Sequence, residues 1–427
     1  MRRISAGLHI DCARRVLFQS PTDFTMDLSL SDASVVDFIS VAVSLVWSGW
    51  LVRRDRFCGF FALIATYYTF LILVFHLGGV FMHQEGFTGK IYEIDETTFL
   101  QVSLYAATFN LIFFSVLSIG STPFELRRGY IGIDAGLIRN IYFGVFVLGA
   151  VVYFFESGSI DYAGYVSYRG VAYGWVLMIV GTSTLVMAYL MRSYAVMAVV
   201  MLIYAYFCLK TGVRSFLLMP LMPLVLLLLA NSDRNLGKKL AVYGSAMLAA
   251  ALALLLLRPA SEIALPEMFL THGLHVVFYK YTGTTDLSTA TPLAGFLTGA
   301  FNYFLKIDPD SFDPAIQFAQ DFYGFVTPDG FYHMPFTWYA DSFAAHGYAG
   351  VVYGAIWAVL IRGLKWLTSR DPLTLCAFLP QACWIAFFVI RGAAANATNS
   401  VTTPMWLSAA VFVFLKVASL TPVRGTR

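Results

Sequence analysis

Three arginine residues stand beside apolar stretches of the sequence. Arg169 lies in SGSIDYAGYVSYRG, Arg214 in LKTGVRSFLL and Arg391 in FFVIRGAAANATNS. A guanidinium group is planar, always charged and able to bind phosphate through two parallel hydrogen bonds. Converging at one membrane face, such groups suit a pyrophosphate, and Lys210 adds a cation in the same short hinge as Arg214. The alternative is that each arginine reaches lipid headgroups or caps a helix.

His333 is the residue best suited to acid–base chemistry. It lies between the turn signals 328–330 (Pro-Asp-Gly) and Pro335, and histidine suits general-base work near neutral pH. Asp341 could orient either His333 or the nearby His346. The alternative for both histidines is a structural role. No metal site is expected, because the spacing of these three residues matches no standard zinc pattern.

The composition places these residues in a membrane protein. The chain has 427 residues, of which 59% are hydrophobic and 12% are charged, and its mean hydropathy is +0.71. Soluble domains carry about 25% charged residues, so we expect an all-α polytopic integral membrane protein. The net charge of +3 gives no indication of a nucleic-acid partner.

Apolar stretches that approach the ~20 residues needed to cross a membrane predict about eleven (10–14) transmembrane helices. They are Val35–Val52, Phe57–Phe81, Thr98–Ile119, Ile141–Phe155, Val171–Met191, Tyr194–Leu209, Ser215–Ala230, Leu240–Leu257, Tyr348–Ile361, Leu373–Ile390 and Val401–Leu420. We therefore expect an N-terminal tail at 1–34 and transmembrane helices over 35–257. A large loop containing short helices follows over 258–340, and C-terminal transmembrane helices over 341–427.

Lysine and arginine favour cytoplasmic loops, and their distribution orients the predicted helices. One set of loops, which includes Arg53, Arg54 and Arg56, carries about twice as many of them as the opposite set and is predicted to be cytoplasmic. The large loop, which begins at Arg258, is then external. An odd number of helices also places the N-terminus outside, although Arg2, Arg3, Arg14 and Arg15 argue against that side.

The large loop is rich in aromatic residues, among them Trp338 and Tyr339 at its end. Such rings can stack on the apolar faces of sugars while neighbouring polar groups bind the hydroxyls. The alternative is an aromatic belt at the membrane interface together with a small hydrophobic core in the loop.

Two ionisable residues fall in or near the predicted spans. His76, in LVFHLGG, is a functional candidate because of its depth, or it bonds a neighbouring helix. Asp37 is expected at the membrane interface. The five cysteines form no CxxC pair and are expected to act as small hydrophobic residues.

Three segments together resemble the bacterial O-antigen or oligosaccharide repeat-unit polymerase (Wzy-type) family, which is related to the O-antigen ligases. TGVRSFLLMPLMPLVLLLL (211–229) is similar to the family's TG-x-R-[SG]-x-L-L segment, and a large external loop comes late in the chain. HMPFTWYADSFAAHGYAGVVYGA (333–355) is similar to the family's aromatic stretch with an acidic residue and then F-x-x-x-G-x-x-G. The resemblance covers about residues 165–420, and the paired arginine repeat of some members is absent.

The resemblance implies a metal-independent, inverting glycosyltransferase without a cofactor, at the periplasmic face of the bacterial inner membrane. It would pass a growing glycan from undecaprenyl pyrophosphate to a lipid-linked repeat unit in lipopolysaccharide or similar polysaccharide biosynthesis. Arg214 would hold the pyrophosphate and His333 would activate the acceptor hydroxyl. The further candidates for substrate binding are Arg169, Arg391, Lys210, Arg258, Asp341, Tyr339 and Trp338.

The partners implied are undecaprenyl-pyrophosphate-linked glycans and membrane lipids, with a chain-length regulator protein as a further candidate. Two alternatives stay open. An O-antigen ligase differs in its acceptor, and a lipid-linked sugar transporter or flippase belongs to another functional class.

Overall fold

The computed structural model describes residues 32–78, 96–124, 135–156, 172–211, 215–230, 273–279 and 337–391, with isolated positions between 238 and 414. The described residues are helical apart from short turns, and none of them forms a strand. Five helical stretches are long and apolar enough to cross a membrane: Asp32–Arg54, Arg56–Leu77, Glu96–Ser118, Gly136–Phe155 and Trp338–Thr368. The chain is therefore an all-helical protein with membrane-spanning character.

The described helices have the following bounds, in chain order. They are α2 (Asp32–Arg54), α3 (Arg56–Gly78), α4 (Glu96–Ser118), α5 (Ala135–Glu156), α6 (Ala172–Leu190), α7 (Tyr194–Thr211), α8 (Ser215–Ala230), α13 (Trp338–His346), the 3-10 helix η4 (Gly347–Val352), α14 (Tyr353–Thr368) and α15 (Pro372–Arg391). Residues 273–279 form a further short helical segment.

The apolar segments predicted within 35–230 and 348–390 coincide with helices to within a few residues, except at two starts and one end. Helix α5 begins at Ala135 rather than Ile141. The helical stretch through α14 begins at Trp338 rather than Tyr348 and ends at Thr368 rather than Ile361. All three extensions contain polar residues, which hide them from a hydropathy criterion. The tail at 1–31 and the predicted span 240–257, Ser245 excepted, lie outside the described residues. So do most of 258–340 and most of 401–420.

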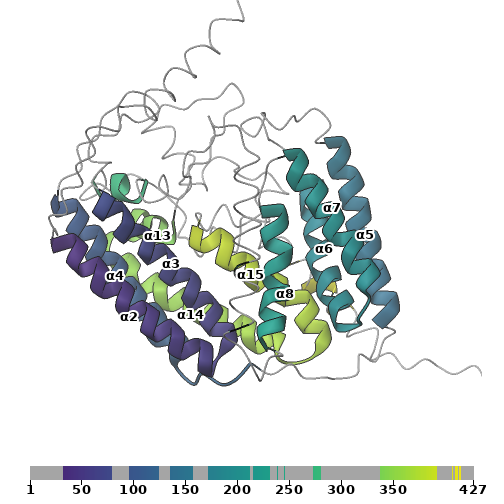
Figure 1. Ribbon diagram of the computed structural model, residues 1–427, viewed down its shortest axis with the longest axis horizontal. Coiled ribbons are helices and arrows are strands. Elements are labelled where there is room, and N and C mark those ends of the chain that lie inside the picture. The colour runs from purple at the N-terminus through teal and green to yellow at the C-terminus, as the bar shows by residue number, and fades with distance from the viewer. Residues whose placement is uncertain are drawn as a thin grey trace, which may run out of the picture.

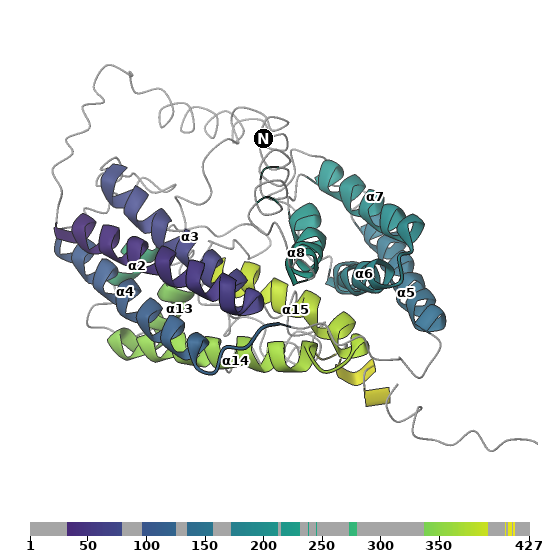
Figure 2. The ribbon, with the colours of Figure 1, turned by 60° about the horizontal axis from the view of Figure 1, so that its bottom comes forward.

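The helices gather in two groups, as Figure 1 and Figure 2 show. Helices α2, α3, α4, α13 and α14 form one group, and α5, α6 and α7 form the other. Helices α8 and α15 lie between them, and both contact α3 on one side and α6 on the other. The described cysteines, Cys58, Cys208, Cys376 and Cys383, are buried thiols that form no disulfide with one another. They act as small hydrophobic residues, as the sequence predicted.

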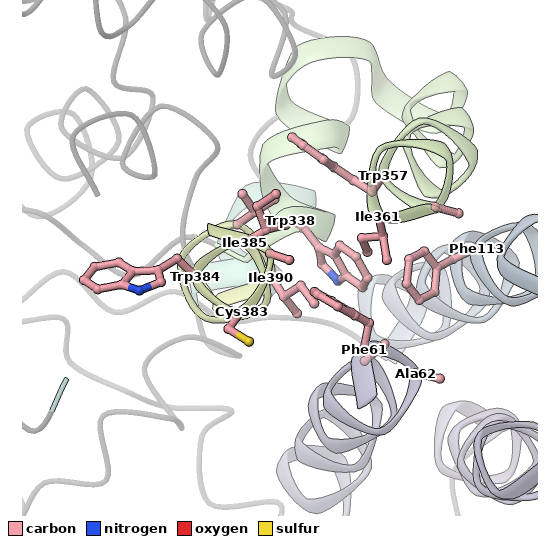
Figure 3. Close-up of a cluster of buried hydrophobic side chains, with 14 of the residues drawn as sticks. Phe61, Ala62, Phe113, Trp338, Trp357, Ile361, Cys383, Trp384, Ile385 and Ile390 are labelled. Atoms are coloured by element: carbon pink, nitrogen blue, oxygen red, sulfur yellow. The ribbon is translucent and has the colours of Figure 1, made fainter. Parts of the chain in front are cut away.

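The core of the first group is built around Trp338, the first residue of α13. Its ring centroid lies 4.9 Å from that of Phe109 and 5.0 Å from that of Phe113, both on α4. Figure 3 shows Trp338 between Phe61 of α3, Phe113 and Ile361 of α14, whereas Trp384 of α15 points away from it. Helix α13 is thus packed inside the bundle by an aromatic cluster.

Three glycines let η4 and α14 lie directly against their neighbours. Gly347 ends α13 with φ of 56°, a conformation that favours glycine. A Cβ atom at Gly350 would overlap the Ser342 carbonyl oxygen, and one at Gly354 would lie 2.6 Å from the Phe109 carbonyl oxygen on α4. Gly350 and Gly354 are four residues apart, the small-xxx-small spacing that brings membrane helices into close contact.

One end of the bundle is held by basic side chains. Lys365 of α14 donates to Asp55 Oδ2 over 2.6 Å and to the Thr122 carbonyl oxygen over 2.6 Å. Arg54 donates to the carbonyl oxygen of Ser121 over 3.3 Å. These bonds place the ends of α2, α4 and α14 together, as expected for loops predicted to share one side of the membrane.

We predict that Gly354→Ala destabilises the protein by about 1–3 kcal/mol, because the added methyl group overpacks the contact between α14 and α4. Gly363→Ala is the matched control on the same helix, since a Cβ atom there meets nothing within 4 Å. It should be neutral or stabilising by about 0.5–1 kcal/mol. Thermal unfolding of the purified protein in detergent measures both, and equal effects would contradict the close packing at Gly354.

Candidate functional site

Asp37 of α2 and His76 of α3 form a buried hydrogen-bonded pair near the end of the helical hairpin. The Nδ1 atom of His76 and the Oδ2 atom of Asp37 are in hydrogen-bonding contact. The side chains are 1% and 2% exposed, respectively. A carboxylate can only accept hydrogen bonds, so Nδ1 of His76 carries the proton.

His275 extends this pair into a chain of three residues. Its Nε2 atom lies 2.5 Å from Nε2 of His76, and the residue is fully buried. With the proton of a neutral His76 on Nδ1, its Nε2 atom is an acceptor, so Nε2 of His275 donates. In a neutral His275, Nδ1 then carries no proton and is an acceptor. We call Asp37, His76 and His275 the relay.

Aromatic rings enclose the relay. Phe75 stacks on His275 at 4.6 Å between centroids, and Phe99 of α4 lies 4.8 Å from the ring of His76. Ser103 Oγ lies 3.4 Å from His76 Nδ1 and itself donates to the Phe99 carbonyl oxygen. Walls of this kind exclude water, and a low local dielectric strengthens the electrostatic coupling between Asp37 and the rings.

The relay can accept a proton at one end and stabilise it at the other. A proton that arrives at Nδ1 of His275 lets the Nε2 proton of that ring move to Nε2 of His76. The positive charge then sits on His76, beside the carboxylate of Asp37. An oriented carboxylate stabilises the imidazolium of a general base in the same way in hydrolases. Both ring nitrogens of His76 are engaged with protein atoms, so its role is to pass protons.

The relay lies at the end of the bundle opposite the basic side chains. Asp37 precedes Asp55 by 18 residues and His76 follows it by 21, so at ~1.5 Å per residue both lie ~27–32 Å from the turn. Asp55 is the one residue between α2 and α3. The two helices are therefore antiparallel, with Asp37 and His76 at similar depth.

A second polar network anchors α13 beside the relay. Tyr339 donates from its hydroxyl to Asn110 Oδ1 over 2.9 Å, and Asn110 donates to Thr69 Oγ1 over 2.8 Å. Tyr105 and Ser342 share a hydrogen bond of 2.8 Å. This network holds the end of the large loop against α3 and α4.

The structure locates only some of the residues that the sequence selected. Trp338, Tyr339 and Asp341 are buried in α13. His346 is exposed and pairs with the Tyr353 hydroxyl at 3.2 Å. Lys210 lies near the end of α7, 4.6 Å above the ring of Phe154. Arg391 is the last residue of α15, and its side chain is not described. His333, Arg214, Arg169 and Arg258 lie outside the described residues.

Two of the relay residues went unrecognised in the sequence. Asp37 was expected at the membrane interface without a partner named, and the structure buries it against His76. A signal did exist: Asp37 and His76 lie at similar distances from a one-residue turn, which brings them together in a hairpin. His275 carried no such signal, because 199 residues separate it from His76.

Comparisons with protein-family models, with curated proteins and with solved structures found no match for this chain. The resemblance to the Wzy-type family therefore rests on the sequence segments alone. The relay is the feature of the described structure that can carry chemistry.

We predict that Asp37→Ala and His76→Ala each destabilise the protein by about 3–5 kcal/mol, because each leaves a polar partner buried without its counterpart. The double variant should lose less than the sum of the two single losses, since the interaction can be lost only once. Asp32→Asn, at the exposed start of α2, is the control and should shift stability by less than about 0.5 kcal/mol. Thermal unfolding in detergent tests this, and strictly additive losses would show that the pair is not coupled.

Proposed function

We propose that this protein is a membrane-embedded glycosyltransferase that polymerises undecaprenyl-pyrophosphate-linked oligosaccharide repeat units at the periplasmic face of the bacterial inner membrane. The observation that carries the proposal is the relay of Asp37, His76 and His275. The relay would supply a buried general base, His275. This residue belongs to the large loop that the sequence predicts on the external side of the membrane, where the proposed transfer takes place.

The relay has the properties that an inverting transfer needs. In the proposed reaction, the acceptor hydroxyl gives its proton to the relay through His275, which is fully buried in the described structure and must become accessible to the substrate. The hydroxyl oxygen forms a bond to the anomeric carbon of the donor at the same time. The bond between that carbon and the pyrophosphate breaks, and its electron pair leaves with the pyrophosphate. The proton is held by the two histidines and balanced by Asp37.

We assign the role of base to His275 because of this geometry. The sequence alone suggested His333 for the same role. Cations near the leaving group would stabilise the charge that develops on it, as preorganised donors do in other transferases. Arg214, Arg169, Arg391 and Lys210 are the candidates for this role.

An apolar groove between α5 and α7 supports a lipid-linked substrate. Its volume is about 550 Å³, and Phe154, Phe155, Leu202 and Tyr206 are among the residues that line it. Lys210 lies at one end of the groove, over Phe154. A prenyl chain in the groove would place a pyrophosphate within reach of this ammonium group.

Contacts along the chain put Lys210 at the same end of the bundle as the relay. Arg56, at the basic end, binds the last carbonyl groups of α8. The first residues of α8 therefore lie at the opposite end, and α7 ends four residues before α8 begins. The groove, Lys210 and the relay would then face the same side of the membrane.

A proton-coupled transporter of lipid-linked sugars is the second candidate. Intramembrane chains of aspartate and histidine also serve as proton relays in pumps and transporters. An O-antigen ligase would use the same chemistry as a polymerase with a different acceptor. The three candidates differ in what accumulates when the relay is broken.

We predict that His275→Ala lowers the rate of polymer formation by about 10²–10⁴-fold, the usual contribution of a general base. The assay uses purified protein in detergent with a lipid-linked repeat unit as substrate, and the products are separated on a gel. Detergent micelles hold no proton gradient, so a transporter would give no product with either protein. Asp32→Asn, at the exposed start of α2 and outside the relay, should retain activity.

In cells, loss of the protein should leave single repeat units on the lipid carrier. Long glycan accumulating on the carrier would instead identify a ligase. Normal long-chain product from a stably expressed His275→Ala variant would refute the assignment of the base.

A further inference from the structure

A second apolar groove lies at the basic end of the bundle, between α3 and α8. Its volume is about 270 Å³, and it is lined by Val52, Arg56, Phe60, Leu63, Ile64, Tyr67, Val225 and Leu229. The groove is apolar along its length and ends at the guanidinium group of Arg56. The relay and the groove beside α7 are at the other end of the helices, so this groove is separate from the proposed active site.

Arg56 is held in place by backbone atoms. Its Nη1 atom donates to the carbonyl oxygens of Leu229, at 2.5 Å, and Ala230, at 3.2 Å. The last carbonyl groups of a helix have no partner within the helix, so these bonds cap α8. They also fix the direction in which the guanidinium plane lies.

The other edge of the Arg56 guanidinium group has N–H donors that bind no atom of the described residues. Within the described part of the chain, Nη1 is the one nitrogen of Arg56 with a hydrogen bond. The N–H groups on Nε and Nη2 form the fork that binds a phosphate with two parallel hydrogen bonds. Asp55, the adjacent carboxylate, is engaged by Lys365 Nζ and by the backbone N–H of Cys58. The charge of Arg56 is thus not paired with its nearest acid.

We propose that this groove binds an anionic diacyl phospholipid from the adjacent membrane leaflet, with one acyl chain along α3 and α8 and its phosphate on Arg56. The apolar lining fits hydrocarbon, and the free guanidinium edge fits the phosphodiester. The exposed Arg53 at the end of α2 adds positive charge at the same membrane surface. A peptide would bring unpaired backbone groups into this apolar setting, and a free phosphate would leave the groove unfilled.

The bound lipid would join two parts of the chain that few other interactions connect. Arg56 begins α3, and the capped carbonyls end α8, more than 170 residues later. A phosphate on the open edge of the guanidinium would order that side chain and so strengthen the cap on α8.

The test is native mass spectrometry of the full-length protein in detergent, titrated with phosphatidylglycerol or phosphatidylcholine. We expect one preferential site for phosphatidylglycerol. Arg56→Gln should weaken this site by roughly tenfold or more, as expected for charge-assisted hydrogen bonds. Leu63→Trp should weaken it as well, because the larger side chain fills the groove while Arg56 remains.

Two controls separate a built site from general attraction. Arg370→Gln removes a charge from a residue that stacks on Trp366, away from the groove, and should leave the affinity within twofold. Val46→Trp adds the same bulk at a residue of α2 that is 76% exposed, and should also be neutral. Equal binding of both lipids, or equal losses in Arg56→Gln and Arg370→Gln, would overturn the proposal. A lipid-independent dimer that Leu63→Trp disrupts would overturn it in favour of a second copy of the chain.

Discussion

The structure depends on how polar groups are satisfied at the basic end of the helices. The last carbonyl groups of a helix have no partner within the helix, so another part of the protein must supply the donor where they are buried. Arg56 caps α8, Arg362 donates to the carbonyl oxygens of Val116 and Leu117 on α4, and Lys365 bridges Asp55 and Thr122. These bonds fix the axial positions of four helices at once. Because α2 and α3 share the one-residue turn at Asp55, fixing that turn also sets the depth of Asp37 and His76 at the far end.

Between the two ends, the helices are aligned by contacts of small residues. Gly59 of α3 lies so close to Val52 that a Cβ atom would overlap its backbone, and Gly354 lies against α4 in the same way. Without a hydrophobic driving force between helices in lipid, such close packing carries much of the association. The aromatic cluster around Trp338 and the hydrogen bonds of Tyr339 then seat α13 against α4. The relay therefore lies in a closely packed part of the molecule.

Hydropathy predicted the helices because the hydrocarbon core imposes one simple requirement, a long apolar stretch. It missed the start of α13, since residues such as Asp341 are buried there in spite of their polarity. The F-x-x-x-G-x-x-G pattern was visible in the sequence, and the structure assigns its glycines to the end of α13 and to close packing. The partners of His76 were hidden for different reasons. The contact between Asp37 and His76 depends on the hairpin that α2 and α3 form, and hydropathy carries no information on which helices pair. The contact with His275 depends on tertiary folding that periodicity does not encode.

The two histidines of the relay come from regions that are synthesised far apart in time. Their separation of 199 residues means that a nascent or truncated chain ending before residue 273 contains the Asp37–His76 pair but lacks His275. The relay is complete only when the second half of the protein has been inserted and residues 273–279 have packed against α3 and α4. Under the proposed function, activity would therefore depend on completed folding, and unfinished chains in the membrane would be inactive.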